Sequence, residues 1–207
     1  MEKVRLNGPQ GTLEGVFECR DQAPVFLLLV GHPHPLHGGT MDNKVVTTLT
    51  RAGRDAGAAT LRFNFRGVGG SAGSFDNAVG ETDDMLAAAD WLRRQAPSAP
   101  LWLAGFSFGS FVAAQAAQRL HQQSHDAARL LLVAPPVHHY DFGAITEVGC
   151  PVWLAQGEQD EVVPADQVFA WAGKSPLQPE VHRLADCSHF FHGRLNELKA
   201  LVMASFP

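Results

Sequence analysis

The sequence lacks the features that mark several classes of protein. Its three cysteines (Cys19, Cys150 and Cys187) are an odd number at wide spacing, which suits a reducing compartment better than a disulfide framework. No cluster of Lys and Arg is present and the net charge is −5, so we expect no nucleic-acid partner. The longest apolar run, residues 24–30, is far shorter than the roughly 20 residues of a membrane span. The first residues contain no apolar segment typical of a secretory signal, and we expect a cytoplasmic protein without a membrane partner.

The composition is that of a globular protein with a sizeable core. Hydrophobic residues make up 45% of the 207 residues and charged residues 18%. This length fits one domain, and no internal repeat or long linker divides it. We therefore expect a single domain over residues 1–207.

Short apolar runs rich in β-formers alternate with Ala- and Leu-rich segments of helical period. The runs predict strands at residues 4–7, 12–19, 25–31, 58–64, 101–104, 130–134, 152–156 and 181–184. The periodic segments predict helices at residues 41–56, 81–95, 110–121, 166–172 and 193–206. The first two strands are expected to be antiparallel, because a short Gly/Pro turn joins them. The rest of the alternation predicts an α/β fold, a mostly parallel sheet with helices on both faces.

One short motif carries the first chemical signal. Gly105-Phe-Ser107-Phe-Gly109 follows a predicted strand and opens a predicted helix, the setting of a G-x-S-x-G nucleophile elbow. The two glycines would let the strand and the helix approach closely around a strained serine. We predict that Ser107 is a nucleophile at a helix N-terminus, where free N–H groups favour a developing negative charge.

A nucleophilic serine needs a base, and the base needs an acid that orients it. In this kind of fold the acid follows the serine in the chain, after a later strand. Residues 157–164 form a carboxylate-rich turn after the strand at 152–156, and we assign the acid to Asp160. Glu158 and Glu161 are local rivals. Asp186 is a weaker rival, because it is close in sequence to the expected histidine.

The expected base is His189, in the loop after the last predicted strand. Its rivals are His182, which falls within that strand, and His192, at the start of the final helix. Cys187 lies near this histidine, but its context is not a strand-to-helix turn, so a catalytic cysteine is disfavoured.

An oxyanion hole needs two backbone donors. The first expected donor is the N–H of Phe108, the residue after the nucleophile. The second should come from the loop that follows the strand at 25–31. In that loop Pro33 and Pro35 have no N–H, which leaves His34 between them as the donor.

The same loop has an alternative interpretation as a metal site, because His32, His34 and His37 are potential zinc ligands. The nearest carboxylate, Asp42, falls in a predicted helix, and the prolines restrict how the imidazoles converge. We therefore expect no metal, and side chains of His32 and His37 that serve the loop itself.

The glycine-rich stretch at residues 66–73 has an alternative interpretation as a nucleotide-binding loop. It lacks the lysine of a phosphate-binding loop, although Gly67, Gly69 and Ala72 fit a loose dinucleotide pattern. No helix opens there, and Asp90 lies inside a predicted helix instead of at a strand end. We expect a tight loop beside the active site and no cofactor.

Taken together, the sequence resembles an α/β-hydrolase, and specifically the small bacterial hydrolases of that superfamily that lack a cap. The segments that carry the resemblance are residues 32–46, 64–69, 105–109, 134–137, 157–164 and 188–191. The resemblance implies a Ser107–His189–Asp160 triad and carboxylic-ester hydrolysis without a cofactor. The chain departs from the His-Gly oxyanion loop of many relatives, because Pro33 follows His32.

Only residues 135–151 separate the strand that ends at 134 from the next one, which is too short for a helical cap. We therefore expect an open, partly apolar cleft, bordered by Phe106, Phe108, His34, Tyr140 and Phe142. Such a cleft favours small or short acyl groups. Tyr140 and Phe142 are equally compatible with a place in the core.

The predicted activity is that of a serine hydrolase acting on small or short-acyl esters, or thioesters, through an acyl-enzyme. The alternatives are a peptidase or amidase, and a non-catalytic binding protein on the same fold. The expected partner is a small-molecule ester, and the sequence gives no indication of oligomeric state.

Overall fold

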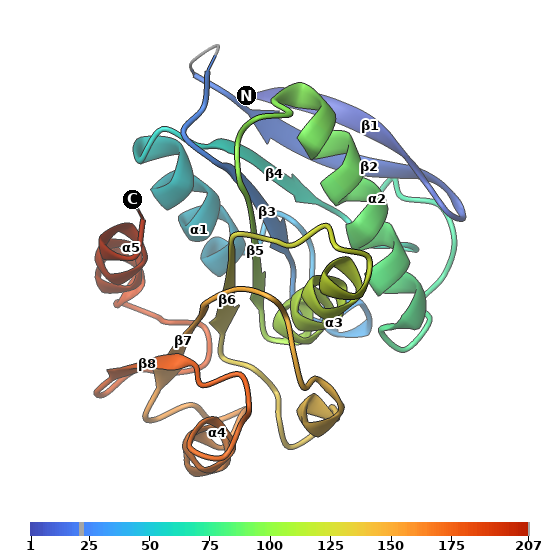
Figure 1. The fold of residues 1–207 in the computed structure, drawn as a ribbon. Coiled ribbons are helices and arrows are strands. Elements are labelled where there is room, and N and C mark those ends of the chain that lie inside the picture. Colours follow the sequence, from blue (N-terminus) through green and yellow to red (C-terminus); the bar gives the residue numbers. More distant parts are fainter. Residues whose placement is uncertain (21–22, 207) are drawn as a thin grey trace.

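The computed structural model describes residues 1–20 and 23–206, and its strands form one eight-stranded sheet (Figure 1). The strands are β1 (Glu2–Gly8), β2 (Gly11–Glu18), β3 (Leu27–Gly31), β4 (Ala59–Phe63), β5 (Leu101–Phe106), β6 (Arg129–Val133), β7 (Val152–Gly157) and β8 (Glu180–Leu184). Their spatial order is β1-β2-β4-β3-β5-β6-β7-β8. The pairs β1–β2 and β2–β4 are antiparallel, and every other pair is parallel. The predicted fold class is confirmed.

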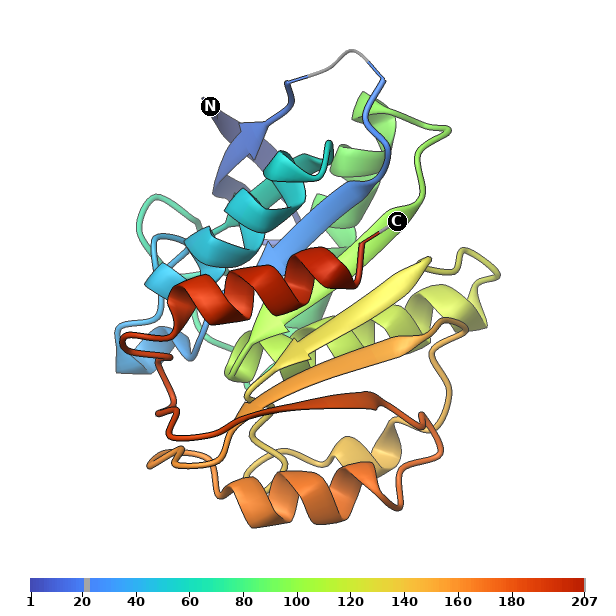
Figure 2. The ribbon, with the colours of Figure 1, turned by 90° about the vertical axis from the view of Figure 1, so that its left-hand side faces the viewer.

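Helices cover both faces of the sheet (Figures 1 and 2). One face carries α1 (Lys44–Asp55) and α5 (Leu195–Ala204), which lie in front of the sheet in Figure 2. The other face carries α2 (Val79–Gln95), α3 (Phe108–Gln122) and α4 (Ala165–Ala172). Two 3-10 turns that the sequence did not predict, η1 (Pro35–His37) and η2 (Phe142–Ala144), follow β3 and β6.

The alternation of side chains along the central strands explains the two layers of core. In β3, Leu27 and Leu29 pack into the cluster under α2 and α3, while Leu28 and Val30 pack into the cluster under α1 and α5. Successive residues of a strand point to opposite faces, so a strand covered on both sides needs an unbroken apolar run. All four side chains are completely buried.

One predicted helix start differs from the observed start because a polar cap decides it. Helix α1 starts at Lys44 instead of residue 41, because the Asn43 Oδ1 accepts the N–H of Val45 at 2.8 Å and caps the helix there. The N–H of Met41 donates instead to the Asn64 Oδ1 at 2.9 Å, which ties this turn to the end of β4.

The strand order places a crevice next to Ser107. From β3 the chain passes to β4 on one side, and later reaches β5 on the other side of β3. At such a change of direction, the loops after the two strands diverge to opposite faces and leave a crevice at their carboxyl ends. The loop of His34 follows β3, and Ser107 follows β5, so both border this crevice.

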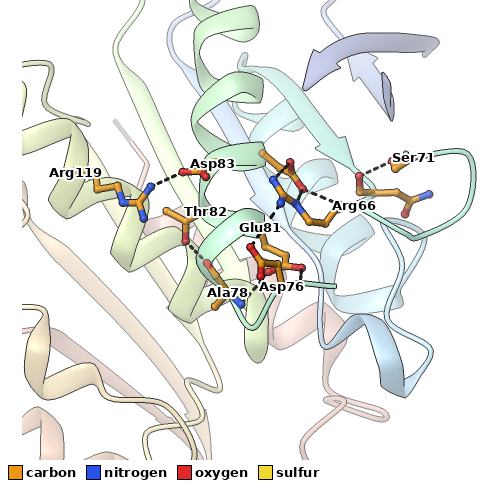
Figure 3. Close-up of polar contacts among 10 residues, drawn as sticks. Arg66, Ser71, Asp76, Ala78, Glu81, Thr82, Asp83 and Arg119 are labelled. Carbon is orange, nitrogen blue, oxygen red and sulfur yellow. Dashed lines mark hydrogen bonds and ion pairs between the residues drawn. The ribbon is translucent and has the colours of Figure 1, made fainter. Parts of the chain in front are cut away.

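The loop between β4 and α2 is fixed by a buried ion pair (Figure 3). The Arg66 guanidinium donates to both oxygens of Asp84, through Nε at 3.0 Å and Nη2 at 2.8 Å, and the Arg66 N–H donates to the same carboxylate at 3.0 Å. The two side chains are 4% and 0% exposed. At the far end of the loop's glycine-rich stretch, the Ser71 hydroxyl donates to the Asn64 carbonyl at 2.7 Å.

A second carboxylate holds the end of the same loop. The buried Glu81 accepts the N–H groups of Asp76 and Ala78, both at 2.8 Å, and the Thr82 hydroxyl donates to the Ala78 carbonyl at 2.6 Å (Figure 3). Burial raises the pKa of Glu81, although these amides act against the rise. Its neighbour in the loop, Phe75, packs against Phe108 with ring centroids 5.8 Å apart. The glycine-rich stretch therefore belongs to a loop beside the crevice that buried hydrogen bonds hold in place.

We expect Asp84→Ala to lower the free energy of unfolding by about 3–5 kcal/mol, because it removes both short hydrogen bonds of the buried Arg66 guanidinium and leaves it only the exposed Asp76 at 3.8 Å. Asp83→Ala is the matched control: its ion pair with Arg119 is 44% and 37% exposed, so the loss should stay below about 1 kcal/mol. Urea unfolding followed by circular dichroism measures both. Similar losses in the two variants would contradict the assigned role of the buried pair.

Candidate active site

Ser107 sits at a sharp turn between β5 and α3. Its backbone angles, φ 53° and ψ −122°, are unusual for a residue with a side chain and cost about 1–3 kcal/mol. A Cβ at Gly105 would collide with the backbone of Gly109, and a Cβ at Gly109 would collide with the backbone of Gly31. The glycines of the motif therefore allow the first turn of α3 to lie directly against β3 and β5, as expected for a nucleophile elbow.

The strained turn is held by hydrogen bonds on both sides. The Ser107 N–H donates to the Val133 carbonyl at the end of β6, at 2.8 Å. The Ser107 carbonyl accepts both the N–H of Ser110 at 2.8 Å and its hydroxyl at 2.6 Å. These contacts fix the backbone, so that the Ser107 hydroxyl is presented at the carboxyl edge of the sheet.

The structure brings Ser107, His189 and Asp160 into one hydrogen-bonded line. The His189 Nδ1 lies 2.8 Å from the Asp160 Oδ2, and the His189 Nε2 lies 3.2 Å from the Ser107 Oγ. An ionised carboxylate only accepts, so the imidazole donates from Nδ1 and Nε2 is left to accept the serine hydroxyl. The side chains of His189 and Asp160 are 3% and 0% exposed, and this burial strengthens their interaction.

The Asp160 carboxylate is fully supported by its own loop and strand. Its Oδ1 accepts the N–H groups of Val162 at 2.9 Å and Val163 at 2.7 Å, and its Oδ2 accepts the Gln156 Nε2 at 3.0 Å. Burial acts to raise the pKa of Asp160, but the hydrogen bonds from His189 and these amides outweigh it and hold the pKa below its usual value. The group is therefore an ionised acceptor at neutral pH.

The rival acids have other places. Glu161 accepts the N–H of His189 at 3.1 Å and so supports the histidine loop from outside. Asp186 accepts the Gln159 side chain at 2.8 Å, while Glu158 lies exposed. None of the three bonds the imidazole of His189 within the described chain.

The alternative candidates for the base and the nucleophile are not placed to act in the reaction. His182 stacks on Trp153 in the sheet and bonds Glu180 at 2.8 Å. His192 is exposed. Burial raises the pKa of the Cys187 thiol to about 11, so it is protonated at neutral pH and a poor nucleophile.

The two predicted oxyanion donors border the crevice. Ser107, Phe108 and His34 all line one cavity, and the rings of His34 and Phe108 lie 5.1 Å apart. Neither the Phe108 N–H nor the His34 N–H donates to another group of the described chain. Both amides are thus available to a ligand.

His32 serves the fold of the loop. Its Nδ1 donates to the Pro33 carbonyl at 2.6 Å and its Nε2 accepts the N–H of Phe65 at 3.0 Å, which ties the loop after β3 to the loop after β4. Burial lowers the pKa of His32 to about 4, so the ring is neutral. With both ring nitrogens engaged it has no free lone pair for a metal, and the described residues contain no group of three or more His, Cys, Asp and Glu that could hold one.

Two cavities flank Ser107. One, of about 160 Å³, is lined by Phe108, Tyr140 and several histidines. The other, of about 250 Å³, is lined by His189, Phe190 and the glycines of the loop after β3. Residues 134–151 are all described and contain only η2, so nothing in that segment caps them.

Two of the expected cleft residues do not reach these cavities. Phe142 is 1% exposed and packs in the core against Phe111 and Trp171, because η2 turns its side chain inward. Phe106 is also buried, with its ring centroid 4.9 Å from that of His189, so it backs the base without lining the cleft.

Several lining residues were not predicted from the sequence, among them His138, His139, Val162 and Phe190. Each lies in a loop that follows the carboxyl end of a parallel strand, and that rule, applied to β6 as it was to β7 and β8, would have indicated the first two.

A family model of the α/β-hydrolase fold matches residues 24–149. The chain belongs to the α/β-hydrolase family. An uncharacterised protein of Rickettsia prowazekii is 37% identical over 211 residues, covering 98% of this chain and 87% of that one. None of the described helices is long and apolar enough to cross a membrane.

Solved structures agree over the whole chain. An α/β serine hydrolase homologue from Coxiella burnetii is 42% identical, with a TM-score of 0.92 over 100% of this chain and 97% of that one. A lidless α/β serine hydrolase from Xanthomonas campestris is 38% identical, with a TM-score of 0.90 over 98% and 92% of the two chains. These similarities support hydrolase activity and a fold without a cap domain.

The buried His32 should make stability depend on pH. Its pKa of about 4 in the folded chain lies below the ordinary value of 6.5, so its stabilisation is complete above pH 6.5 and is lost as the pH falls towards 4. At about pH 5 the loss should reach about 2 kcal/mol. In urea unfolding, His32→Asn should be less stable at neutral pH but lose less on acidification. The exposed His125→Gln control should keep the wild-type slope, and an unchanged slope in His32→Asn would contradict the assignment.

Proposed function

We propose that the chain is a single-domain serine hydrolase that cleaves short-acyl carboxylic esters, or thioesters, through an acyl-enzyme. The observation that carries the proposal is the line of contacts from Asp160 through His189 to Ser107, at 2.8 and 3.2 Å. The Ser107 Oγ attacks the ester carbonyl, and its proton passes to the His189 Nε2. Asp160 accepts the hydrogen bond from the His189 Nδ1–H throughout the reaction and stabilises the imidazolium.

The tetrahedral intermediate collapses when His189 returns the proton to the leaving oxygen or sulfur. The bond from the carbonyl carbon to the leaving group breaks, and Ser107 remains acylated. Water then attacks the acyl-enzyme with His189 again acting as the base, and the acid product leaves. These reaction steps need no cofactor.

The developing oxyanion would be bound by the N–H groups of Phe108 and His34. Both amides are unused within the described chain, and Phe108 opens a helix whose dipole favours negative charge. In relatives of this fold one donor follows the nucleophile and the other comes from the loop after the third strand, which matches these two positions.

The size of the cleft supports short acyl groups. The two cavities beside Ser107 measure about 160 and 250 Å³, which suits small groups on either side of the scissile bond. Without a cap the site lies open to water, so it offers no enclosed tunnel for a long lipid chain. Phe108 and Tyr140 are among the apolar residues that line the smaller cavity.

We expect Ser107→Ala to lower kcat for p-nitrophenyl butyrate by about 10⁴-fold or more, because it removes the nucleophile, and His189→Ala to lower it comparably. Asp160→Asn should cost about 10⁴-fold. Ser98→Ala, at an exposed serine far from the crevice, is the matched control and should keep full activity. Steady-state assays measure kcat for each variant, and circular dichroism checks that each variant is folded. An active Ser107→Ala variant would contradict the proposal.

A fluorophosphonate probe tests the nucleophile without assuming a substrate. It should label Ser107 in the wild type, as located by peptide mass spectrometry, and labelling should be lost in His189→Ala. Iodoacetamide should leave Cys187 unmodified near neutral pH, since its thiol is buried and protonated. Failure to label Ser107 would favour a non-catalytic binding protein, and faster cleavage of p-nitroanilides than of esters would favour an amidase.

A further inference from the structure

The cavity of about 160 Å³ beside Ser107 has an unusual lining. Four histidines surround it: His34 and His37 from the loop after β3, and His138 and His139 from the loop after β6. We call this cavity the imidazole pocket. No Asp, Glu, Lys or Arg is among its described lining residues.

The imidazoles have donors to spare. The His34 ring stacks on His37, with centroids 4.4 Å apart, and its Nδ1 accepts the N–H of Leu36 at 3.2 Å, which leaves Nε2–H as the free donor. The ring nitrogens of His37, His138 and His139 form no hydrogen bond with the described chain. A neutral imidazole offers one N–H and a protonated one offers two, so the pocket presents a concentrated set of donors.

No acidic side chain lines the pocket to offset the charge of protonated imidazoles. Burial lowers the pKa of His34 and of His138, and repulsion from neighbouring imidazoles lowers both further. An anion placed among the rings would reverse that repulsion and favour their protonated forms.

Two carboxylates outside the pocket act on residues that line it. Asp160 acts on His138 from the β7–α4 loop, but its oxygens are taken by His189, Gln156 and two amides. Glu81 acts on Tyr140 from α2, but it is taken by two amides of its own loop. Neither carboxylate lines the pocket, which leaves the space among the imidazoles to an anionic group of a ligand.

The position of the catalytic histidine tells which part of an ester enters the imidazole pocket. His189 lines the other cavity, of about 250 Å³, and not the imidazole pocket. A base that protonates the leaving oxygen must lie on the side from which that group departs. The leaving group therefore occupies the cavity of His189, and the acyl chain occupies the imidazole pocket.

From this geometry we propose that the imidazole pocket binds an anionic group at the end of the acyl chain, so that the favoured substrates are half-esters of short dicarboxylic acids. The inference rests on the proposed ester hydrolysis. His138 and His139 are exposed at the rim, where they meet the carboxylate, and His34 and His37 face it from the opposite loop. The role of the four side chains is specificity: they act on the charge of the acyl group, whereas Ser107 and the two backbone oxyanion donors act on the reacting carbonyl.

A matched pair of substrates tests the proposal. Mono-p-nitrophenyl adipate carries a carboxylate at the end of the acyl chain, and p-nitrophenyl methyl adipate is its neutral counterpart. We expect the ratio of their kcat/KM values, anionic over neutral, to rise about three- to tenfold as the pH falls from about 8 to about 6. The ratio cancels the effect of pH on the catalytic steps, because the same triad serves both substrates.

The variants assign the effect to the pocket. The double variant His138→Gln, His139→Gln should lose most of the rise in the ratio, and His37→Gln should lose part of it. His125→Gln, at an exposed histidine outside the pocket, is the matched control and should behave as the wild type. A ratio that is flat with pH, or that falls, would overturn the proposal. So would an unchanged rise in the double variant.

Two further outcomes separate this proposal from the ones on which it rests. In para-acetoxybenzoate the carboxylate lies on the leaving group. If its kcat/KM rises relative to that of its methyl ester as the pH falls, while the ratio for the adipate pair does not rise, the anion binds on the leaving-group side and the acyl assignment is wrong. If neither member of the adipate pair is cleaved and the fluorophosphonate probe fails to label Ser107, the proposed hydrolase activity itself fails. Cleavage of the neutral ester without any preference for the anionic one removes only the inference about the imidazole pocket.

Discussion

The close approach of three backbones around Ser107 is the constraint on which the site depends. The first turn of α3 lies against β3 and β5 so tightly that neither Gly105 nor Gly109 has room for a Cβ. This contact forces Ser107 into backbone angles that a serine rarely adopts, and the bonds to Val133 and Ser110 hold it there. A serine in a relaxed turn would not be held at one height and angle above the sheet. The strain therefore places the hydroxyl within reach of a histidine that arrives from a loop 82 residues later in the chain.

The rest of the site follows from the direction of the strands. Parallel strands end at one edge, so the loops after β3, β5, β6, β7 and β8 meet there although the chain reaches them far apart in sequence. That rule made Ser107, Asp160 and His189 predictable in order and place, and it made His34 predictable as a neighbour. The element types were predictable as well, although the ends of the elements shifted. The periodicity of apolar residues fixes a helix or strand, whereas a single cap such as Asn43 fixes where it starts.

The sequence could not show which way the short connections turn their side chains. Tyr140 and Phe142 are two residues apart, and both were compatible with the cleft. The Asp141 side chain accepts the N–H of Ala144 and closes η2, and this turn sends Phe142 into the core while Tyr140 stays at the cavity. The same limit applies to Glu161, whose bond to the His189 backbone depends on how two distant loops fold against each other. Spacing alone distinguishes neither case, because each depends on contacts made only after the sheet is assembled.

The polar groups around the crevice are of two kinds, which differ in burial and in whether they have hydrogen-bond partners. Arg66 with Asp84, Glu81 and the ring of His32 are buried, and each is bonded to defined partners that fix the loops bordering the site. Burial makes their partners obligatory, since an unpaired polar group there would cost several kcal/mol. The histidines at the rim of the imidazole pocket are exposed and lack such partners, so their donors remain available at little cost to stability. The buried, hydrogen-bonded groups thus fix the loops that border the crevice. The exposed histidines on those loops keep free hydrogen-bond donors and can respond to the charge of a ligand.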